Sequence, residues 1–225
     1  GYYGVEGYYS DFLQEAASLG SGWQPRGKVS INGQTFLPSG RGPDLVLSLD
    51  QSIQLLAQRE LLWGLKEFRA DSGTIMVMEP KAGRILAMVS YPTYDPNEYE
   101  EVAKENADLF INLAVNSQYE PGSVFKIVTM AAALDSGLVT PDSTYQDTGS
   151  LVFGGRVIYN WDKRAYGVTT MRELLQHSLN VGAGTLSIRM GPETFYGYVD
   201  RFGFGQKMGV DLAGEVPGLV KHPGD

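Results

Sequence analysis

A serine and a lysine stand three residues apart at the start of one apolar segment, YEPGSVFKIVTMAAAL, residues 119–134. Ser123 and Lys126 share one side of the helix that this segment predicts, because residues at i and i+3 are neighbours on a helix surface. A serine hydroxyl is a weak nucleophile until a base removes its proton. A partly buried lysine can be that base, since desolvation lowers its pKa towards neutrality. The pair therefore predicts a serine nucleophile activated by an amine.

Each of these residues also has an ordinary structural interpretation. Ser123 could cap the helix, and Lys126 could extend to solvent. The helix is apolar on almost every side, however, which predicts a place in the domain interior with little access to water for the lysine. A lysine also opposes the helix dipole near an N-terminus, whereas negative charge developing on Ser123 is favoured there. The structural interpretations fit less well together than they do separately.

A second polar motif, Ser178-Leu179-Asn180, is required for a specific prediction, because a serine three residues before a lysine occurs by chance in many chains. The motif falls where one predicted helix ends and another begins. Asn180 could simply cap the second helix. In the functional interpretation, Ser178 relays protons and the Asn180 amide holds a carbonyl or amide group of a substrate.

Other kinds of chemistry have less support. His177 and His222 lack clear carboxylate partners and the chain has no cysteine, so we expect no metal site and no cofactor. His177 adjoins Ser178, but neighbouring residues of a helix point apart. The net charge of −8, without a Lys/Arg cluster among aromatic residues, argues against nucleic acid as a partner.

The elements that must position these residues follow from hydrophobic periodicity. Residues 45–49 (LVLSL) predict a short strand, and Asp50 is a candidate N-cap. The helix after Asp50 would place Leu61, Leu65 and Phe68 on one apolar face. Residues 1–44, rich in Gly, Ser and Pro, predict a small irregular module.

The clearest pattern is a hairpin over residues 73–92 with its turn at 79–83. Both strands are almost continuously apolar, so we expect helices on both faces of the sheet. From Pro96 onward the pattern predicts helices throughout. Strands early and helices late indicate the α+β class.

Two of the later helices have recognisable boundaries. Thr170 and Glu173 form a candidate capping box, and a helix from about residue 181 to 190 should stop at Gly191 and Pro192. A last helix contains three apolar residues and ends at a glycine: Phe195, Val199, Phe202 and Gly203.

Taken together, the motifs resemble those of the penicillin-binding proteins, and most closely the monofunctional class B D,D-transpeptidases of bacterial cell-wall synthesis. The similar stretches run along nearly the whole chain in the expected order: GVEGYY, LSLDQSIQLLAQREL, GTIMVMEPKAGRILAMVSYPTYDPN, YEPGSVFK, SLN and FGFGQKMGVDLAGEVPG. The resemblance implies an α+β, penicillin-binding/β-lactamase-like fold: an antiparallel sheet with helices on both faces and an all-helical subdomain. It also implies that residues 1–44 end a non-catalytic pedestal or linker module and that residues 45–225 are the N-terminal part of the transpeptidase domain.

The resemblance further implies a role for each motif residue. Ser123 would be acylated by the D-Ala-D-Ala end of a peptidoglycan stem peptide, or by a β-lactam acting as a covalent inhibitor. Lys126 would be the general base, and the Ser123 backbone N–H would form half of the oxyanion hole. Ser178 would pass the proton towards the leaving group, and Asn180 would bind the peptide. The amine of a second peptide would then resolve the acyl-enzyme and form the cross-link.

The sequence departs from the family pattern in two places. Leu179 replaces the more usual small or acidic residue, which the motif should tolerate. The K-T-G motif of the family does not occur in these 225 residues. The family places it downstream of the S-x-N motif, so we expect it beyond Asp225 and expect the fold to be incomplete at the C-terminus. The chain alone should therefore be catalytically crippled.

Alternative functions remain open at this point. The same fold could serve a β-lactamase, a D,D-carboxypeptidase or a β-lactam sensor, or a non-catalytic scaffold of the cell-wall synthesis complex. For the transpeptidase, the resemblance implies partner proteins of cell-wall synthesis in the membrane, in division or in the maintenance of cell shape. It also implies a location at the extracytoplasmic face of the bacterial cytoplasmic membrane, with an anchor helix upstream.

Overall fold

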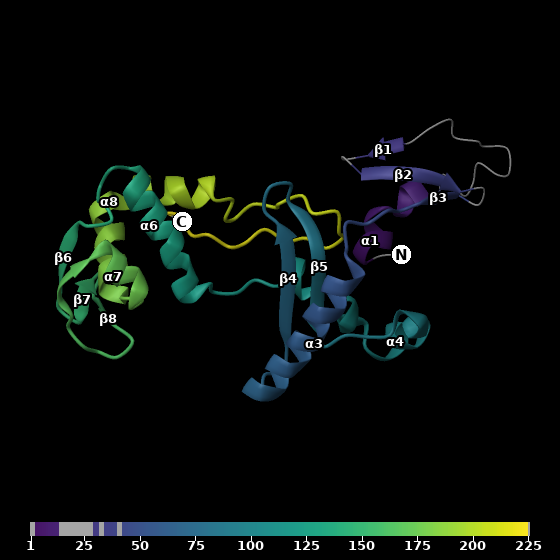
Figure 1. The fold of residues 1–225 in the computed structure, drawn as a ribbon, viewed down its shortest axis with the longest axis horizontal. Helices are drawn as coiled ribbons and strands as arrows, with labels where there is room; N and C mark the ends of the chain where they lie inside the picture. Colours follow the sequence, from purple (N-terminus) through teal and green to yellow (C-terminus); the bar gives the residue numbers. More distant parts are fainter. Residues whose placement is uncertain (1–2, 14–28, 32–33, 40–41, 225) are drawn as a thin grey trace. The chain divides into compact units, whose positions relative to one another are not determined.

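The computed structural model describes residues 3–13, 29–31, 34–39 and 42–224. The chain divides into two compact units. The first comprises the residues up to Ser117 together with Gly209–Val216, and the second comprises Gln118–Met208 together with Pro217–Asp225. Figure 1 labels the main helices and strands of both units.

The first unit contains three strands near the N-terminus, a hairpin and several helices. Their bounds are α1 (Gly4–Tyr8), β1 (Val29–Ile31), β2 (Gln34–Ser39), β3 (Gly42–Asp44), α3 (Gln51–Phe68), β4 (Gly73–Glu79), β5 (Arg84–Tyr91), α4 (Tyr99–Glu105) and α5 (Leu113–Asn116), with short 3₁₀ turns η2 (Pro96–Glu98) and η3 (Ala107–Phe110). Strands β1, β2 and β3 form an antiparallel sheet in that order. Strands β4 and β5 form the predicted hairpin, whose confirmed turn lies between Glu79 and Arg84.

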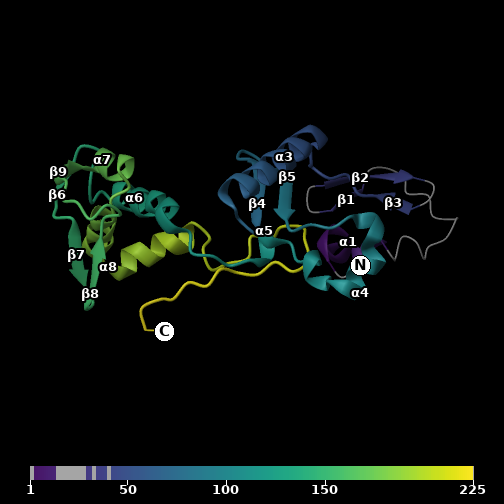
Figure 2. The same cartoon turned by 90° about the horizontal axis from the view of Figure 1, so that it is seen from below.

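Helices contact both faces of the β4–β5 hairpin, as Figure 2 shows for α3 and α5. Leu61 of α3 packs in one core cluster with Ala87 and Val89 of β5. The intervening Met88 points to the other face, because successive side chains of a strand alternate. There its sulfur accepts a hydrogen bond from Asn112, the N-cap of α5, at 3.2 Å.

Two local predictions for the segment before the hairpin are wrong and one is confirmed. Residues 45–49 form no strand: Ser48 bonds to the Ile85 carbonyl through its hydroxyl, so the segment runs beside β5 without a backbone ladder. Asp50 caps α3 as predicted, accepting from the Ile53 N–H at 3.0 Å. Phe68 is not on the packed face of α3, because 76% of it is exposed at the end of the helix.

The second unit contains the predicted helices and also four strands. The bounds are η4 (Gly122–Phe125), α6 (Lys126–Asp135), β6 (Thr144–Asp147), β7 (Ser150–Phe153), β8 (Arg156–Tyr159), β9 (Gly167–Thr170), α7 (Met171–Gln176) and α8 (Asn180–Arg201). Strand β6 pairs with β9, and β7 pairs with β8, both antiparallel. The prediction of helices throughout after Pro96, and with it the all-helical subdomain, is therefore wrong.

The β7–β8 hairpin has a physical origin that the helical interpretation overlooked. Its turn is Gly154-Gly155, and both glycines have positive φ angles, 56° and 75°. Two consecutive positive φ angles define the two-residue turn whose twist suits a β-hairpin. The flanking SLVF and RVIY are rich in the β-branched and aromatic residues that favour strands.

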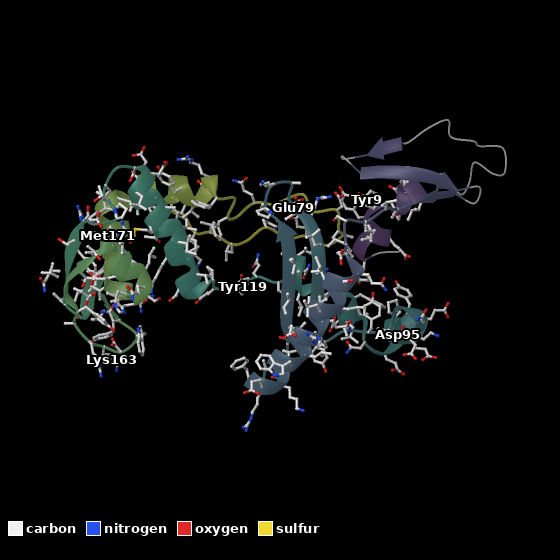
Figure 3. The ribbon with its side chains drawn as sticks, in the orientation of Figure 1. Tyr9, Glu79, Asp95, Tyr119, Lys163 and Met171 are labelled. Carbon is white, nitrogen blue, oxygen red and sulfur yellow. The ribbon has the colours of Figure 1, made fainter. Side chains whose placement is uncertain are left out.

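Three helices enclose the core of the second unit. The buried residues come from α6, α7, α8 and the connections between them: Met130, Ala133, Val139, Met171, Leu174, Leu179 and Leu186. Figure 3 labels Met171, the first residue of α7, which follows Thr170, the N-cap of the confirmed Thr170–Glu173 capping box. Gly191 (φ 75°, ψ 165°) interrupts α8 before Pro192, which confirms the predicted break.

Candidate active site

Ser123 and Lys126 lie where a 3₁₀ turn passes into an α-helix. Ser123 is in η4, after Gly122 with a positive φ of 60°, and Lys126 is the first residue of α6. The N-caps of η4 and α6 are Pro121 and Phe125, which excludes the ordinary interpretation of Ser123 as a helix cap. Its hydroxyl instead contacts the lysine, with Lys126 Nζ 3.2 Å from Ser123 Oγ.

The Lys126 side chain brings the two sequence motifs together. Only 9% of the residue is exposed. Its Nζ lies 3.0 Å from Ser178 Oγ and 2.6 Å from the Ser178 carbonyl oxygen. It also lies 2.6 Å from Asn180 Oδ1. Ser178 and Asn180 lie 52 and 54 positions after Lys126 in the chain. All four residues that the sequence nominated therefore meet at the Lys126 amine.

The backbone between α7 and α8 explains how Ser178 presents two oxygens to the lysine. Ser178 has a φ of 53°, in the left-handed region that non-glycine residues rarely occupy. Strain of this kind persists where surrounding structure enforces it, and it is concentrated at functional sites. Here the next residue supplies the anchor, because Leu179 is fully buried in the core of the unit. The unusual middle residue of the motif thus packs inward while its neighbours face Lys126.

Asn180 is not a helix cap, which excludes the ordinary interpretation of this residue. It is the first residue of α8, and Leu179 occupies the N-cap position. Its Nδ2 donates to the Tyr159 carbonyl oxygen at 2.8 Å. Because an amide has one donor end and one acceptor end, this bond directs Oδ1 towards Lys126.

The surroundings of Lys126 suit a base rather than a permanent cation. Burial lowers the pKa of its ammonium group. In the neutral form, its two N–H groups match the two acceptor-only oxygens, the Ser178 carbonyl and Asn180 Oδ1. The nitrogen lone pair is then left for a hydroxyl hydrogen of Ser123 or Ser178. The arrangement can take a proton from one hydroxyl and return it to the other.

Two further groups at the site could not be predicted from the sequence: the carbonyl oxygens of Ser178 and Tyr159. Every residue has a carbonyl, so no residue type marks them. His177 packs against the Tyr166 ring, with centroids 5.3 Å apart, rather than serving as a base for Ser178. Within the described ranges, no three His, Cys, Asp or Glu side chains cluster as metal ligands do. Nor does any helix among these residues have the length and apolarity needed to cross a membrane.

Known protein sequences resemble this chain along most of its length. The family model of the penicillin-binding protein transpeptidase domain matches residues 73–224. Stage V sporulation protein D of Bacillus subtilis is 36% identical over 223 residues, which cover 98% of this chain and 34% of that protein. The probable peptidoglycan D,D-transpeptidase PenA of Neisseria flavescens is 36% identical over 197 residues, covering 88% of this chain and 46% of that protein. The chain thus spans less than half the length of these relatives.

Solved structures extend the agreement to the fold. Penicillin-binding protein 3 of Mycobacterium tuberculosis, complexed with aztreonam, has a TM-score of 0.71 and 36% identity, covering 78% of this chain and 39% of that one. A putative peptidoglycan glycosyltransferase from Atopobium parvulum has a TM-score of 0.75 and 31% identity, covering 98% of this chain and 48% of that one. The α+β transpeptidase fold predicted from the sequence is confirmed. The chain belongs to the penicillin-binding protein transpeptidase domain family.

Proposed function

We propose that the protein containing this chain is a peptidoglycan D,D-transpeptidase that works through an acyl-enzyme on Ser123. One observation carries the proposal: Lys126 Nζ is within hydrogen-bonding distance of both Ser123 Oγ (3.2 Å) and Ser178 Oγ (3.0 Å). A single amine can therefore serve the nucleophile and a second hydroxyl. Relatives named as probable peptidoglycan D,D-transpeptidases support the reaction class.

In the acylation step, the neutral amine of Lys126 takes the Ser123 hydroxyl proton as Oγ attacks the carbonyl carbon of the penultimate D-Ala. Negative charge develops on the carbonyl oxygen, next to the Ser123 N–H near the start of the helix. The proton then passes from Lys126 to the leaving nitrogen by way of Ser178 Oγ, and the terminal D-Ala departs. The amine of a second stem peptide attacks the ester, loses a proton by the reverse route and releases Ser123.

Asn180 would hold the substrate in this scheme. An amide nitrogen carries two hydrogens, and the Tyr159 carbonyl takes one of them. We assign the second to a carbonyl group of the stem peptide. A β-lactam would acylate Ser123 in place of the peptide, which the aztreonam complex of penicillin-binding protein 3 supports.

The proposal is tested by labelling the full-length protein with a fluorescent penicillin and recording intact-protein mass spectra. We expect a single covalent adduct on the wild type and none on Ser123→Ala. A wild type that forms no adduct would contradict the enzymatic role and favour a scaffold. An adduct that water removes within minutes would instead indicate a β-lactamase or a carboxypeptidase, because a transpeptidase requires an amine acceptor.

We also infer the setting of the domain. Residues 1–44 would belong to a pedestal or linker module and residues 45–225 to the N-terminal part of the transpeptidase domain. The separate β1–β2–β3 sheet, which ends at Asp44, supports this division. Peptidoglycan as substrate implies a position at the extracytoplasmic face of the cytoplasmic membrane, among membrane partners of cell-wall synthesis. Protease digestion of intact protoplasts tests the position: a protected protein would contradict it.

A further inference from the structure

A buried carboxylate lies behind the active site without taking part in the chemistry described above. Asp147, at the end of β6, is 1% exposed. Its Oδ1 accepts from the N–H groups of Gly149 (3.0 Å) and Tyr166 (3.2 Å). Asn160 Nδ2 donates to the same oxygen at 2.9 Å, and the Tyr145 hydroxyl donates to Oδ2 at 2.9 Å. No ion pair among the described residues includes Asp147, so four neutral donors alone compensate its burial.

The carboxylate determines how Asn160 is oriented. A carboxylate only accepts hydrogen bonds, so the Asn160 amide must turn its Nδ2 towards Asp147. The same Nδ2 donates to the Arg164 carbonyl at 3.0 Å, in the loop where Figure 3 labels Lys163. Asn160 is also 1% exposed, which leaves its amide no solvent alternative. Its Oδ1 is therefore directed away from Asp147.

That Oδ1 oxygen reaches the first turn of α8. It accepts from the Val181 N–H at 3.2 Å. The first N–H groups of a helix have no partner within the helix, so this bond satisfies one of them from outside. The backbone before Asn160 makes a parallel contact, because the Tyr159 carbonyl receives the Asn180 side chain. Two adjacent residues at the end of β8 thus hold the start of α8: Tyr159 binds the Asn180 side chain, and Asn160 binds the Val181 backbone.

A third contact to the first turn of α8 comes from Tyr145, which also binds Asp147. The Tyr145 ring lies so close to Gly182 that a Cβ there would be 2.5 Å from the tyrosine hydroxyl oxygen. Burial, followed by the hydrogen bond to Asp147, raises the pKa of that hydroxyl, which keeps it a neutral donor. Asp147 thereby fixes Tyr145 against the first turn of α8.

We propose that Asp147 and Asn160 are positioning residues for the serine–lysine centre: together they set the start of α8 and so direct the Asn180 amide oxygen at Lys126. Neither residue touches the reacting atoms, and both act through Asn180. The expected effect of these residues on the acylation rate rests on the proposed function. Their expected effect on the pKa of Lys126 does not depend on that function.

The decisive variant is Asn160→Leu, which keeps the approximate volume but removes the bonds to Asp147 and Val181. In the full-length protein we expect acylation by a fluorescent penicillin to slow by about 10- to 100-fold, since small misplacements at a reacting centre have effects of this size. Asp147→Asn should have a smaller effect, because an amide oxygen can still accept the three N–H bonds. If Asn160→Leu does not fold, Asn160→Ser, which leaves space for water, takes its place with the same expectation.

The matched control is Val199→Ala, a buried substitution in the second half of α8 that should lower the melting temperature without slowing acylation. As a second readout, the ¹³Cε signal of Lys126 is titrated by NMR. Loss of the Asn180 acceptor removes a bond that stabilises the ammonium form, so the pKa of Lys126 should fall further in Asn160→Leu. The described partners of Nζ are the uncharged Ser123, Ser178 and Asn180.

Folded Asn160 variants that acylate at the wild-type rate and leave the Lys126 titration unchanged would overturn the proposal. Equal slowing in Val199→Ala would overturn it too, because stability alone would then explain the effect. A wild type that forms no adduct would refute the proposed function, whereas the titration would still decide the positioning role.

Discussion

Two buried polar side chains of the second unit, Lys126 and Asp147, have opposite relations to their partners. Lys126 has four oxygens within 3.2 Å of its Nζ, more than the three hydrogens that an ammonium group can donate. Asp147 accepts four hydrogen bonds, three from N–H groups and one from the Tyr145 hydroxyl, and each of these groups acts towards it as a donor. The protons around the lysine can therefore occupy more than one arrangement, and those around the aspartate cannot.

This difference separates a reactive centre from its support. Burial lowers the pKa of Lys126, and the excess of acceptors includes two hydroxyls that can themselves give up a proton. The Asp147 network is also buried, but its hydrogen bonds are fully satisfied, which makes it rigid. A buried polar group can thus serve chemistry when its partners can exchange protons with it, as around Lys126. It serves positioning when every partner only donates to it, as around Asp147.

The largest effect that would sharpen this comparison is expected for Lys126→Ala. Without the base, acylation of the full-length protein by penicillin should fall by about 10²- to 10⁴-fold. Circular dichroism should show that the helices remain. In the wild type, acylation should rise with pH through the pKa of Lys126, because the neutral amine is the base. Burial lowers that pKa, so the rise should begin below the range of an exposed lysine. A Lys126→Ala protein that acylates normally would rule out the lysine as base.

Asn180→Asp would convert the reactive centre into an ordinary ion pair. A carboxylate beside Nζ favours the ammonium form and should therefore raise the pKa of Lys126. At neutral pH the neutral fraction, and with it the acylation rate, should fall by about tenfold or more. The pH–rate profile provides the measurement, and its rising limb should move to higher pH. A profile that stays in place would show that Asn180 does not govern the protonation of Lys126.

Gly182→Ala tests the packing that joins the two regions. The new Cβ would lie 2.5 Å from both the Tyr145 hydroxyl and a Leu174 methyl, so something must shift. Overpacking of this kind destabilises by about 1–3 kcal/mol, which urea unfolding measures. The matched control is Gly197→Ala in the same helix, where a Cβ would have no neighbour within 4 Å. That control should stabilise by about 0.5–1 kcal/mol, and equal destabilisation by both variants would contradict the packing argument.

The smallest effect is expected for Thr170→Ala, which removes the cap of α7 outside both networks. The capping box joins Thr170 to Glu173 at 2.8–3.2 Å. Losing such a cap lowers the free energy of unfolding by about 0.5–2 kcal/mol. Acylation at a temperature where the protein is folded should stay at the wild-type rate. A large loss of acylation would show that the site depends on overall stability rather than on the contacts of α8.

Features that depend on a few neighbouring residues could be predicted from the sequence. The i, i+3 spacing of Ser123 and Lys126, the Asp50 cap and the Thr170–Glu173 box are all local. The hairpin over residues 73–92 and the helix break at Gly191 are local too. In each case the physical cause lies within one turn of helix or one turn of chain, where side-chain type alone fixes the outcome.

Other features were decided only by tertiary structure. Residues 45–49 have the composition of a strand, yet the hydrogen bonds to β5 are a side-chain bond from Ser48 and a backbone bond from Asp50, just after the segment. The sequence nominated Ser178 and Asn180 as a second polar motif, but the left-handed backbone and carbonyl of Ser178 at Lys126 depend on how Leu179 is buried. Asp147 and Asn160 carry no local signature at all. Their role arises from contacts with residues 13 to 21 positions away, and such contacts exist only once β6, β8 and α8 have packed together.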